Sequence, residues 1–142
     1  MEEMMFFICP AIFLFLGILF IALSQILYKK HIQMFATYTG KADGVLLRWC
    51  HHQSTLHTGV TGWYPVLSYS VGGQHYEKEE PIAYPGKGKE KIAAVIHYLP
   101  AEPHKFYVNK DIYLRQVRVF KIAGCVAVIF SLFVFAVVYY LV

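Results

Sequence analysis

Four side chains of the metal-ligating types lie close together near the end of a β-prone segment. Cys50, His51 and His52 are consecutive, and His57 follows in a polar stretch. Such sulfur and imidazole donors suit zinc or copper. Because adjacent strand residues point to opposite faces, the three consecutive residues can supply at most two ligands to one ion. Without C-x-x-C or H-E-x-x-H spacing, we expect a solvated polar loop here, with a metal centre as the alternative.

Two further stretches contain residues that catalysis or anion binding would use. The segment 86–91 alternates glycine with lysine, which can cradle a phosphate, but it lacks the G-x-x-x-x-G-K-[ST] spacing and precedes a β-prone run. Glu77, Glu79 and Glu80 lie together, yet no matched nucleophile accompanies them. We therefore expect a solvated loop, a solvated strand edge, no cofactor and no enzymatic activity.

Two long uncharged runs constrain the rest of the chain. Residues 6–27 and 122–142 contain no charged side chain. As helices rising 1.5 Å per residue, such runs reach about 30 Å, the thickness of a bilayer's hydrocarbon core. The first lacks the basic start and the small-residue cleavage site of a secretory signal. Both are predicted to be transmembrane helices.

Composition agrees with a membrane protein that carries one small domain. Hydrophobic residues make up 57% of the 142 residues and charged residues only 15%, which is too apolar for an ordinary soluble domain. About 90 residues remain between the runs, enough for one small core. Of the three cysteines, only Cys50 lies outside the runs, so no disulfide framework is expected.

All 13 lysines and arginines lie between residues 29 and 121, against seven acidic residues there. Cations next to the ends of the spans favour the cytoplasmic side. The predicted orientation depends on these flanking cations, because a long domain can cross the membrane despite its charge. We expect a bacterial inner-membrane protein with both termini outside and a cytoplasmic domain, without nucleic-acid binding. The residues expected at the anionic membrane surface are Lys29, Lys30, Arg115, Arg118 and Lys121.

The intervening segment changes from helical to β-prone patterns and back. Residues 28–39 are predicted to extend the first helix, 40–110 to form a small β domain, and 111–121 to lead into the second span. Gly72-Gly73 predicts a two-residue hairpin turn because both glycines accept positive φ. The fold class is therefore membrane α+β, with two transmembrane helices flanking a small antiparallel sheet or partly open barrel. The expected strands are 45–50, 63–71, 74–79, 91–99 and 106–108, with Pro100 and Pro103 ending pairing before the last.

Several short motifs in this segment resemble those of domain of unknown function family 3592, whose members are small membrane proteins. They are Gly40–Gly44 with the strand after it, Pro65-Val-Leu-Ser-Tyr69 followed by Gly-Gly-x-x-Tyr76, and Ile96-His-Tyr-Leu-Pro-Ala-Glu-Pro103. Leu99 stands where a small polar residue is usual. The resemblance implies a β domain between two transmembrane helices and no established activity.

Small residues recur every four positions in the second run. Ala123, Ala127 and Ser131 would share one helical stripe, and such stripes let helix backbones approach closely. The partner of this stripe is either the first helix of the same chain or a helix of another subunit, so both a monomer and a homo-oligomer agree with the sequence.

With no coherent catalytic set and 17% aromatic residues, the sequence favours a membrane-anchored, non-enzymatic protein-binding module. Such a module would serve as an accessory subunit, a regulator or an immunity-type partner of a membrane complex. The alternative is a metal-handling or enzymatic membrane protein that uses the Cys50, His51, His52 and His57 cluster.

Overall fold

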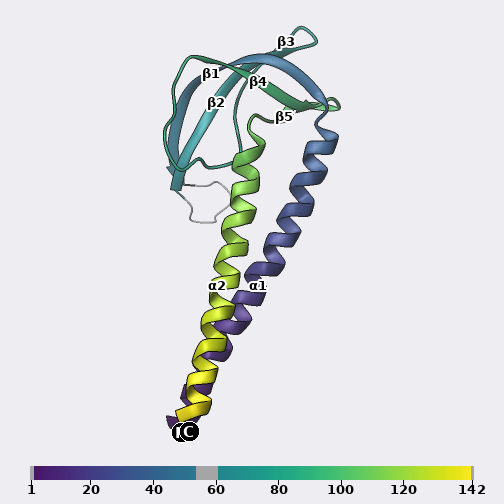
Figure 1. Cartoon of the computed structure of the whole chain (residues 1–142). Coiled ribbons are helices and arrows are strands. Elements are labelled where there is room, and N and C mark those ends of the chain that lie inside the picture. The colour runs from purple at the N-terminus through teal and green to yellow at the C-terminus, as the bar shows by residue number, and fades with distance from the viewer. Residues whose placement is uncertain (1, 54–60, 142) are drawn as a thin grey trace. The chain divides into compact units, whose positions relative to one another are not determined.

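The computed structural model describes residues 2–53 and 61–141, which form two helices and five strands (Figure 1). The chain divides into two compact units. The helical unit comprises residues 1–32 and 114–142, and the sheet unit comprises residues 33–113. The predicted α+β class, with two long apolar helices flanking an antiparallel sheet, is confirmed. In chain order the elements are α1 (Glu2–Thr37), β1 (Gly40–Gln53), β2 (Thr61–Val71), β3 (Gln74–Glu79), β4 (Ile92–Leu99), β5 (Glu102–Tyr107) and α2 (Lys110–Leu141).

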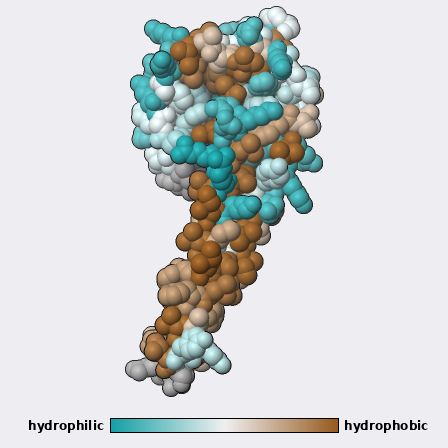
Figure 2. Space-filling view, in the orientation of Figure 1, coloured by the Kyte–Doolittle hydropathy of each residue, from teal (hydrophilic) through white to brown (hydrophobic). Residues whose placement is uncertain are grey.

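Both helices are long and apolar enough to cross a membrane, judged by length and composition. The qualifying segments are Met4–Thr37 and Lys110–Leu141, which include the predicted span 6–27 and residues 122–141 of the second predicted span. Only 11% of the most apolar window of each helix is buried, whereas the core helix of a soluble protein would be mostly buried. Figure 2 shows the exposed apolar side chains as a nearly continuous hydrophobic surface over the helices.

Within the helical unit, α1 and α2 pack through small residues. A Cβ atom added at Gly17 would lie 2.9 Å from the carbonyl oxygen of Gly124, and one added at Gly124 would lie 2.8 Å from that of Gly17. The helices therefore touch backbone to backbone at this point. The buried positions recur every seven residues, as in a left-handed helix pair, and are Pro10, Gly17, Ser24 and His31 in α1 and Val117, Gly124 and Ser131 in α2.

This packing differs from the small-residue stripe expected from the sequence. Ser131 is fully buried and its hydroxyl donates to the carbonyl oxygen of Pro10 at 2.6 Å. Ala127 is half-buried, while Ala123 is exposed. Gly124 takes the place expected for Ala123, because a seven-residue repeat keeps one side of α2 against α1 better than a strict four-residue repeat does.

The sheet is antiparallel throughout, with strand order β3-β2-β1-β4-β5. β1 lies at its centre and pairs with β2 and β4, while β3 and β5 are the edges. The predicted Gly72-Gly73 turn joins β2 to β3, with φ angles of 59° and 81°. Such positive values at both central residues match the right-handed twist of the flanking strands, so this prediction is confirmed.

Several strand boundaries differ from the prediction. β1 begins at Gly40 instead of Val45 and ends at Gln53 instead of Cys50, so His51 and His52 lie in the strand and not in the expected polar loop. Within β1, a Cβ at Gly44 would lie only 2.7 Å from the carbonyl oxygen of Ser68. Gly44 therefore lets β1 and β2 approach closely. β5 contains Pro103, which was expected to end pairing, because an edge strand needs no amide donor on its outer side.

The sheet unit has two apolar clusters. The first covers one sheet face and comprises Leu46, Leu67, Tyr69, Ile96 and Phe106. The second gathers Ile82, Tyr107 and Tyr113 and includes the adjoining end of α1 through Met34 and Phe35. Leu67 and Tyr69 both belong to the first cluster because residues two apart on a strand share one face. The sheet face opposite the first cluster is called the outer face below.

Candidate functional site

Strand geometry separates the members of the predicted metal-ligand cluster. Cys50 and His52 share the outer face of β1, whereas the ring of His51 lies on the other side, 4.5 Å from the ring of Trp63. His57 lies outside the described residues. The alternation expected for consecutive strand residues thus sends His51 away from its neighbours.

His52 takes part in an interaction network on the outer face. Its ring stacks on Tyr64 with a centroid distance of 4.4 Å, and Nε2 contacts the carboxylate of Glu79. Within residues 2–53 and 61–141, no three His, Cys, Asp or Glu side chains are grouped so as to hold a metal ion. The contacts shown make His52 part of a polar surface on the outer face.

An ion pair lies beside the His52–Glu79 contact. Arg48 Nη1 donates to Glu77 Oε1 at 2.8 Å, so this ion pair and the His52–Glu79 contact both connect β1 to the edge strand β3 across β2. Glu77 and Glu79 share one face because they are two residues apart. Charged side chains on an edge strand discourage pairing with another chain, which makes β3 a poor site for strand addition.

Next to these charges, the outer face carries an exposed apolar patch. It consists of Val45, Ala93 and Val95 and is called the valine patch. Val45 pairs in register with both Ser68 and Ala93. The exposed fractions are 41% for Val45 and 49% for Val95. Exposed β-branched residues on a regular sheet offer a flat apolar contact surface with polar neighbours, as binding surfaces do.

The residue that sequence reasoning missed is Glu80, directly after β3. It was expected on a solvated edge, but its exposed fraction is 0%. The expectation was wrong because the chain turns after β3 and continues along β2, where the amide of Glu80 donates to the carbonyl oxygen of Pro65 at 2.9 Å. The local sequence signal is the apolar segment 82–84 that follows.

Three donors from three segments converge on the Glu80 carboxyl group. The hydroxyl of Tyr84 donates to Oε2 at 2.8 Å, while the amide of Val108 and the hydroxyl of Tyr113 donate to Oε1 at 3.1 Å and 3.2 Å. Glu80 thereby joins the segment after β3, the end of β5 and the first turn of α2. We call this group the Glu80 junction.

Burial raises the pKa of Glu80 to about 7, even though the hydrogen bonds from Tyr84, Val108 and Tyr113 oppose the rise. Burial, and after it the nearby Glu80 carboxyl group, likewise raise the pKa of Tyr84. A carboxyl that titrates near neutrality resembles a catalytic acid. Glu80 is nevertheless sealed from solvent, so its geometry serves to hold three segments together.

The glycine- and lysine-rich segment 86–91 covers two tryptophans. The indole nitrogen of Trp49 donates to the carbonyl oxygen of Lys89 at 3.1 Å, and Gly88 lies against the same ring. Lys87 lies 5.9 Å from the ring centroid of Trp63 and pairs with Glu90 at 3.1 Å. Lys87 and Gly88 therefore contact protein groups within the sheet unit.

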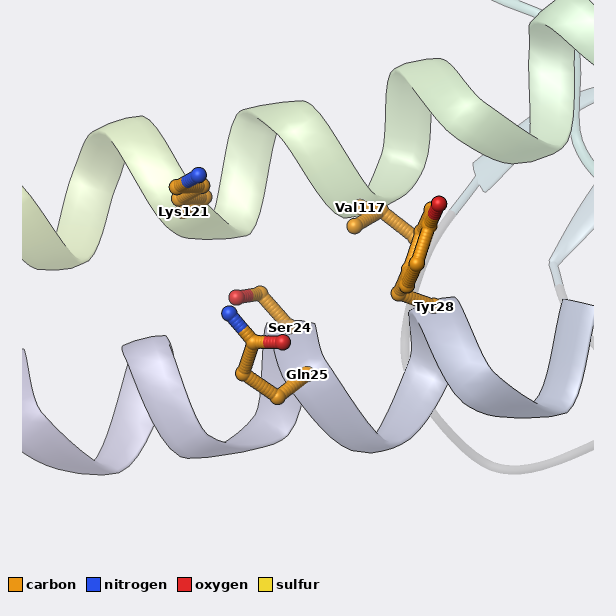
Figure 3. A pocket seen from close by; sticks show the side chains of 5 residues that line it. All are labelled: Ser24, Gln25, Tyr28, Val117 and Lys121. Carbon is orange, nitrogen blue, oxygen red and sulfur yellow. The ribbon is translucent and has the colours of Figure 1, made fainter. Parts of the chain in front are cut away.

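In the helical unit, the five cations predicted for the membrane surface are all exposed, and none of them forms a salt bridge with a described residue. One of them, Lys121, lines a cavity of about 180 Å³ between α1 and α2, together with Ser24, Gln25, Tyr28 and Val117 (Figure 3). Sequence spacing offered no signal for this cavity, since its lining comes from two helices far apart in the chain.

No protein-family model, curated protein or solved structure matches this chain.

Proposed function

We propose that this chain is a membrane-anchored, non-enzymatic binding module whose sheet unit binds another membrane protein. The observation that carries the proposal is the exposure of the apolar helices, since apolar side chains cover their outward positions. Each Å² of apolar surface left in water costs about 25 cal/mol, so surface on this scale requires a cover. Lipid is a cover that suits two antiparallel helices of bilayer length.

The valine patch supports the binding half of the proposal. Val45 and Val95 stay exposed on a face whose other side chains are mostly polar. The buried carboxyl of Glu80 is inaccessible to a substrate. An exposed apolar patch beside charged side chains suits the contact surface of an accessory subunit, regulator or immunity-type partner.

The proposal includes the orientation expected from the sequence. Lys29, Lys30 and Arg118 belong to the exposed cations near one end of the helical unit, and such cations favour the cytoplasmic side. The sheet unit is then cytoplasmic and the termini lie outside a bacterial inner membrane. A small β domain between two spans also agrees with the proposed membership of domain of unknown function family 3592.

Carbonate washing of membranes that contain the full chain tests the anchor. The chain should stay with the vesicles, because two inserted helices cannot dissolve in alkaline water. Release into the supernatant would contradict the anchor.

Extraction in mild detergent, followed by native electrophoresis, tests the binding half. The chain should migrate as a complex with a second protein, and the double variant Val45→Lys, Val95→Lys should run alone. Lys78→Glu is the matched control because it changes the charge of an exposed strand residue on the opposite face of the sheet. Lys78 pairs in register with Leu67, which belongs to the first cluster. Migration of the unaltered chain alone, or of a complex of copies only, would contradict a separate partner.

Elemental analysis of the purified full chain addresses the metal-handling alternative. We expect no stoichiometric zinc or copper, because Cys50 and His52 alone offer too few ligands for a tetrahedral site. A bound metal that Cys50→Ser removes would overturn the non-enzymatic proposal and favour that alternative.

A further inference from the structure

The helical unit carries positive charge without any nearby carboxylate of its own. Residues 4–32 and 114–142 contain no aspartate or glutamate, while Lys29, Lys30, Arg115, Arg118 and Lys121 are grouped toward one end. None of these five cations has a salt-bridge partner among the described residues. Uncompensated cations on an apolar element at a membrane surface attract anionic groups.

Lys121 differs from the other four because it lines the cavity between the helices. Figure 3 shows Gln25 and Ser24 on α1 extending toward the helix that carries Lys121, and Tyr28 beside Val117. The Ser24 hydroxyl donates to the carbonyl oxygen of Ile21 at 2.7 Å. The donors left for a ligand are the Lys121 ammonium, the Gln25 amide and the Tyr28 hydroxyl.

The cavity has room for a small polar group. Its volume of about 180 Å³ is several times the ~30 Å³ that one water molecule occupies in the liquid. A cation with two neutral donors and no carboxylate selects a compact anion with several acceptor oxygens. Phosphate oxygens meet that requirement.

The surroundings of the cavity favour a phosphate that carries acyl chains. Ile26 and Ile122, next in sequence to Gln25 and Lys121, are 63% and 57% exposed. Residue 122 also begins the uncharged run of α2. A ligand here would have its charged group beside Lys121 and an apolar continuation along both helices, which is the layout of a phospholipid at the membrane interface.

We propose that the cavity lined by Ser24, Gln25, Tyr28, Val117 and Lys121 binds the phosphate of an anionic phospholipid. This inference rests on the proposed membrane anchor and adds a lipid site to it. Lys121 supplies the charge, Gln25 and Tyr28 supply neutral hydrogen bonds, and Val117 forms the apolar wall.

The test uses the full chain in nanodiscs of phosphatidylglycerol mixed with phosphatidylcholine, and native mass spectrometry counts the lipids that stay bound. Phosphatidylglycerol should be enriched over its share in the disc. Lys121→Gln should lower that enrichment about tenfold, because it removes a charge-assisted hydrogen bond to the phosphate within the cavity. The matched control, Lys30→Gln, removes an equal charge outside the cavity and should lower it less than twofold.

The remaining outcomes separate the lipid site from the anchor. A chain that fails to enter nanodiscs and is stripped by carbonate would overturn the anchor and the site together. Insertion with equal effects of Lys121→Gln and Lys30→Gln would overturn the site alone. In discs of phosphatidylcholine only, Lys121-dependent binding of added inorganic phosphate, without phosphatidylglycerol enrichment in mixed discs, would show a soluble phosphate as the ligand and overturn the lipid assignment.

Discussion

The helical unit and the sheet unit use opposite rules of burial. In the helical unit the contact between elements is made by small residues such as Gly17 and Gly124, while large apolar side chains face outward. In the sheet unit large apolar side chains such as Leu67 and Ile96 are fully buried. Water drives apolar groups inward, but lipid gives no such drive, so close backbone contact takes its place.

The two units also treat polar groups differently. The sheet unit buries one carboxyl group, Glu80, and satisfies it with three donors. The helical unit buries the hydroxyls of Ser24 and Ser131, and both donate to backbone carbonyl oxygens. An apolar surrounding penalises an unpaired hydroxyl strongly, so a short side chain that bonds to nearby backbone is well suited to it.

The largest expected effect comes from removing the Glu80 junction. At pH 5.5, Glu80→Ala should lower the free energy of unfolding of the sheet unit by about 3–5 kcal/mol, because it opens a cavity and leaves buried donors without an acceptor. Urea titration of the full chain in detergent measures this free energy of unfolding. Trp49 and Trp63 are the only tryptophans, so fluorescence reports on this unit. Glu80→Gln is the control, and an equal loss there would contradict the junction.

The pH dependence of the sheet unit follows from the same carboxyl group. Its pKa in the folded chain, about 7, lies above the ordinary value of 4.5. The folded state therefore holds the proton more tightly, and its stabilisation is complete below pH 4.5 and lost as the pH rises through 7. The loss amounts to about 3 kcal/mol. Urea titrations across this range should show the loss as a pH-dependent difference in unfolding free energy between the unaltered chain and Glu80→Gln, because the glutamine side chain does not titrate.

In the helical unit, steric crowding should have the main effect. Gly124→Ala should cost about 1–3 kcal/mol, since its Cβ would lie 2.7 Å from Ile21 and 2.8 Å from the Gly17 carbonyl oxygen. Spin labels on the exposed Cys9 and Cys125, with Cys50→Ser, report the helix separation by double electron–electron resonance. The distance should increase in Gly124→Ala and stay constant in Ala123→Val, whose side chain faces outward. Equal distances in both variants would argue against the glycine contact.

A smaller effect is expected from one donor of the junction. Tyr84→Phe removes the hydroxyl that donates to Glu80 Oε2, at a cost of about 1 kcal/mol. Because that hydrogen bond lowers the pKa of Glu80, its removal should move the pH transition above 7. Urea titration over pH measures both quantities, and a downward shift of the transition would contradict the assigned donor.

The smallest effect should come from the exposed charges of the outer face. Arg48→Gln removes the ion pair with Glu77, whose side chains are 56% and 45% exposed. Exposed pairs are screened by water and salt and gain little. The urea midpoint should stay within experimental error of the unaltered chain, and a shift comparable with that of Tyr84→Phe would show that the pair is structural.

Local residue patterns were sufficient to predict each element by itself. The uncharged runs predicted two long helices, the Gly72-Gly73 pair predicted a hairpin, and strand alternation separated His51 from Cys50 and His52. Each of these properties depends on backbone geometry and on the period of side chains along one element. The resemblance to family 3592 and the binding role stay predictions.

Only the tertiary structure decided which residues meet across elements. Glu80 belongs to a run of charged residues, and its burial depends on the chain returning along β2 to bring Tyr84 within reach of its carboxyl and on α2 supplying Tyr113. In the same way, the helix contact uses Gly124 instead of Ala123, because the crossing with Gly17 determines which side of α2 is buried. Sequence spacing governs where side chains point along an element, whereas partners from distant segments depend on how whole elements pack.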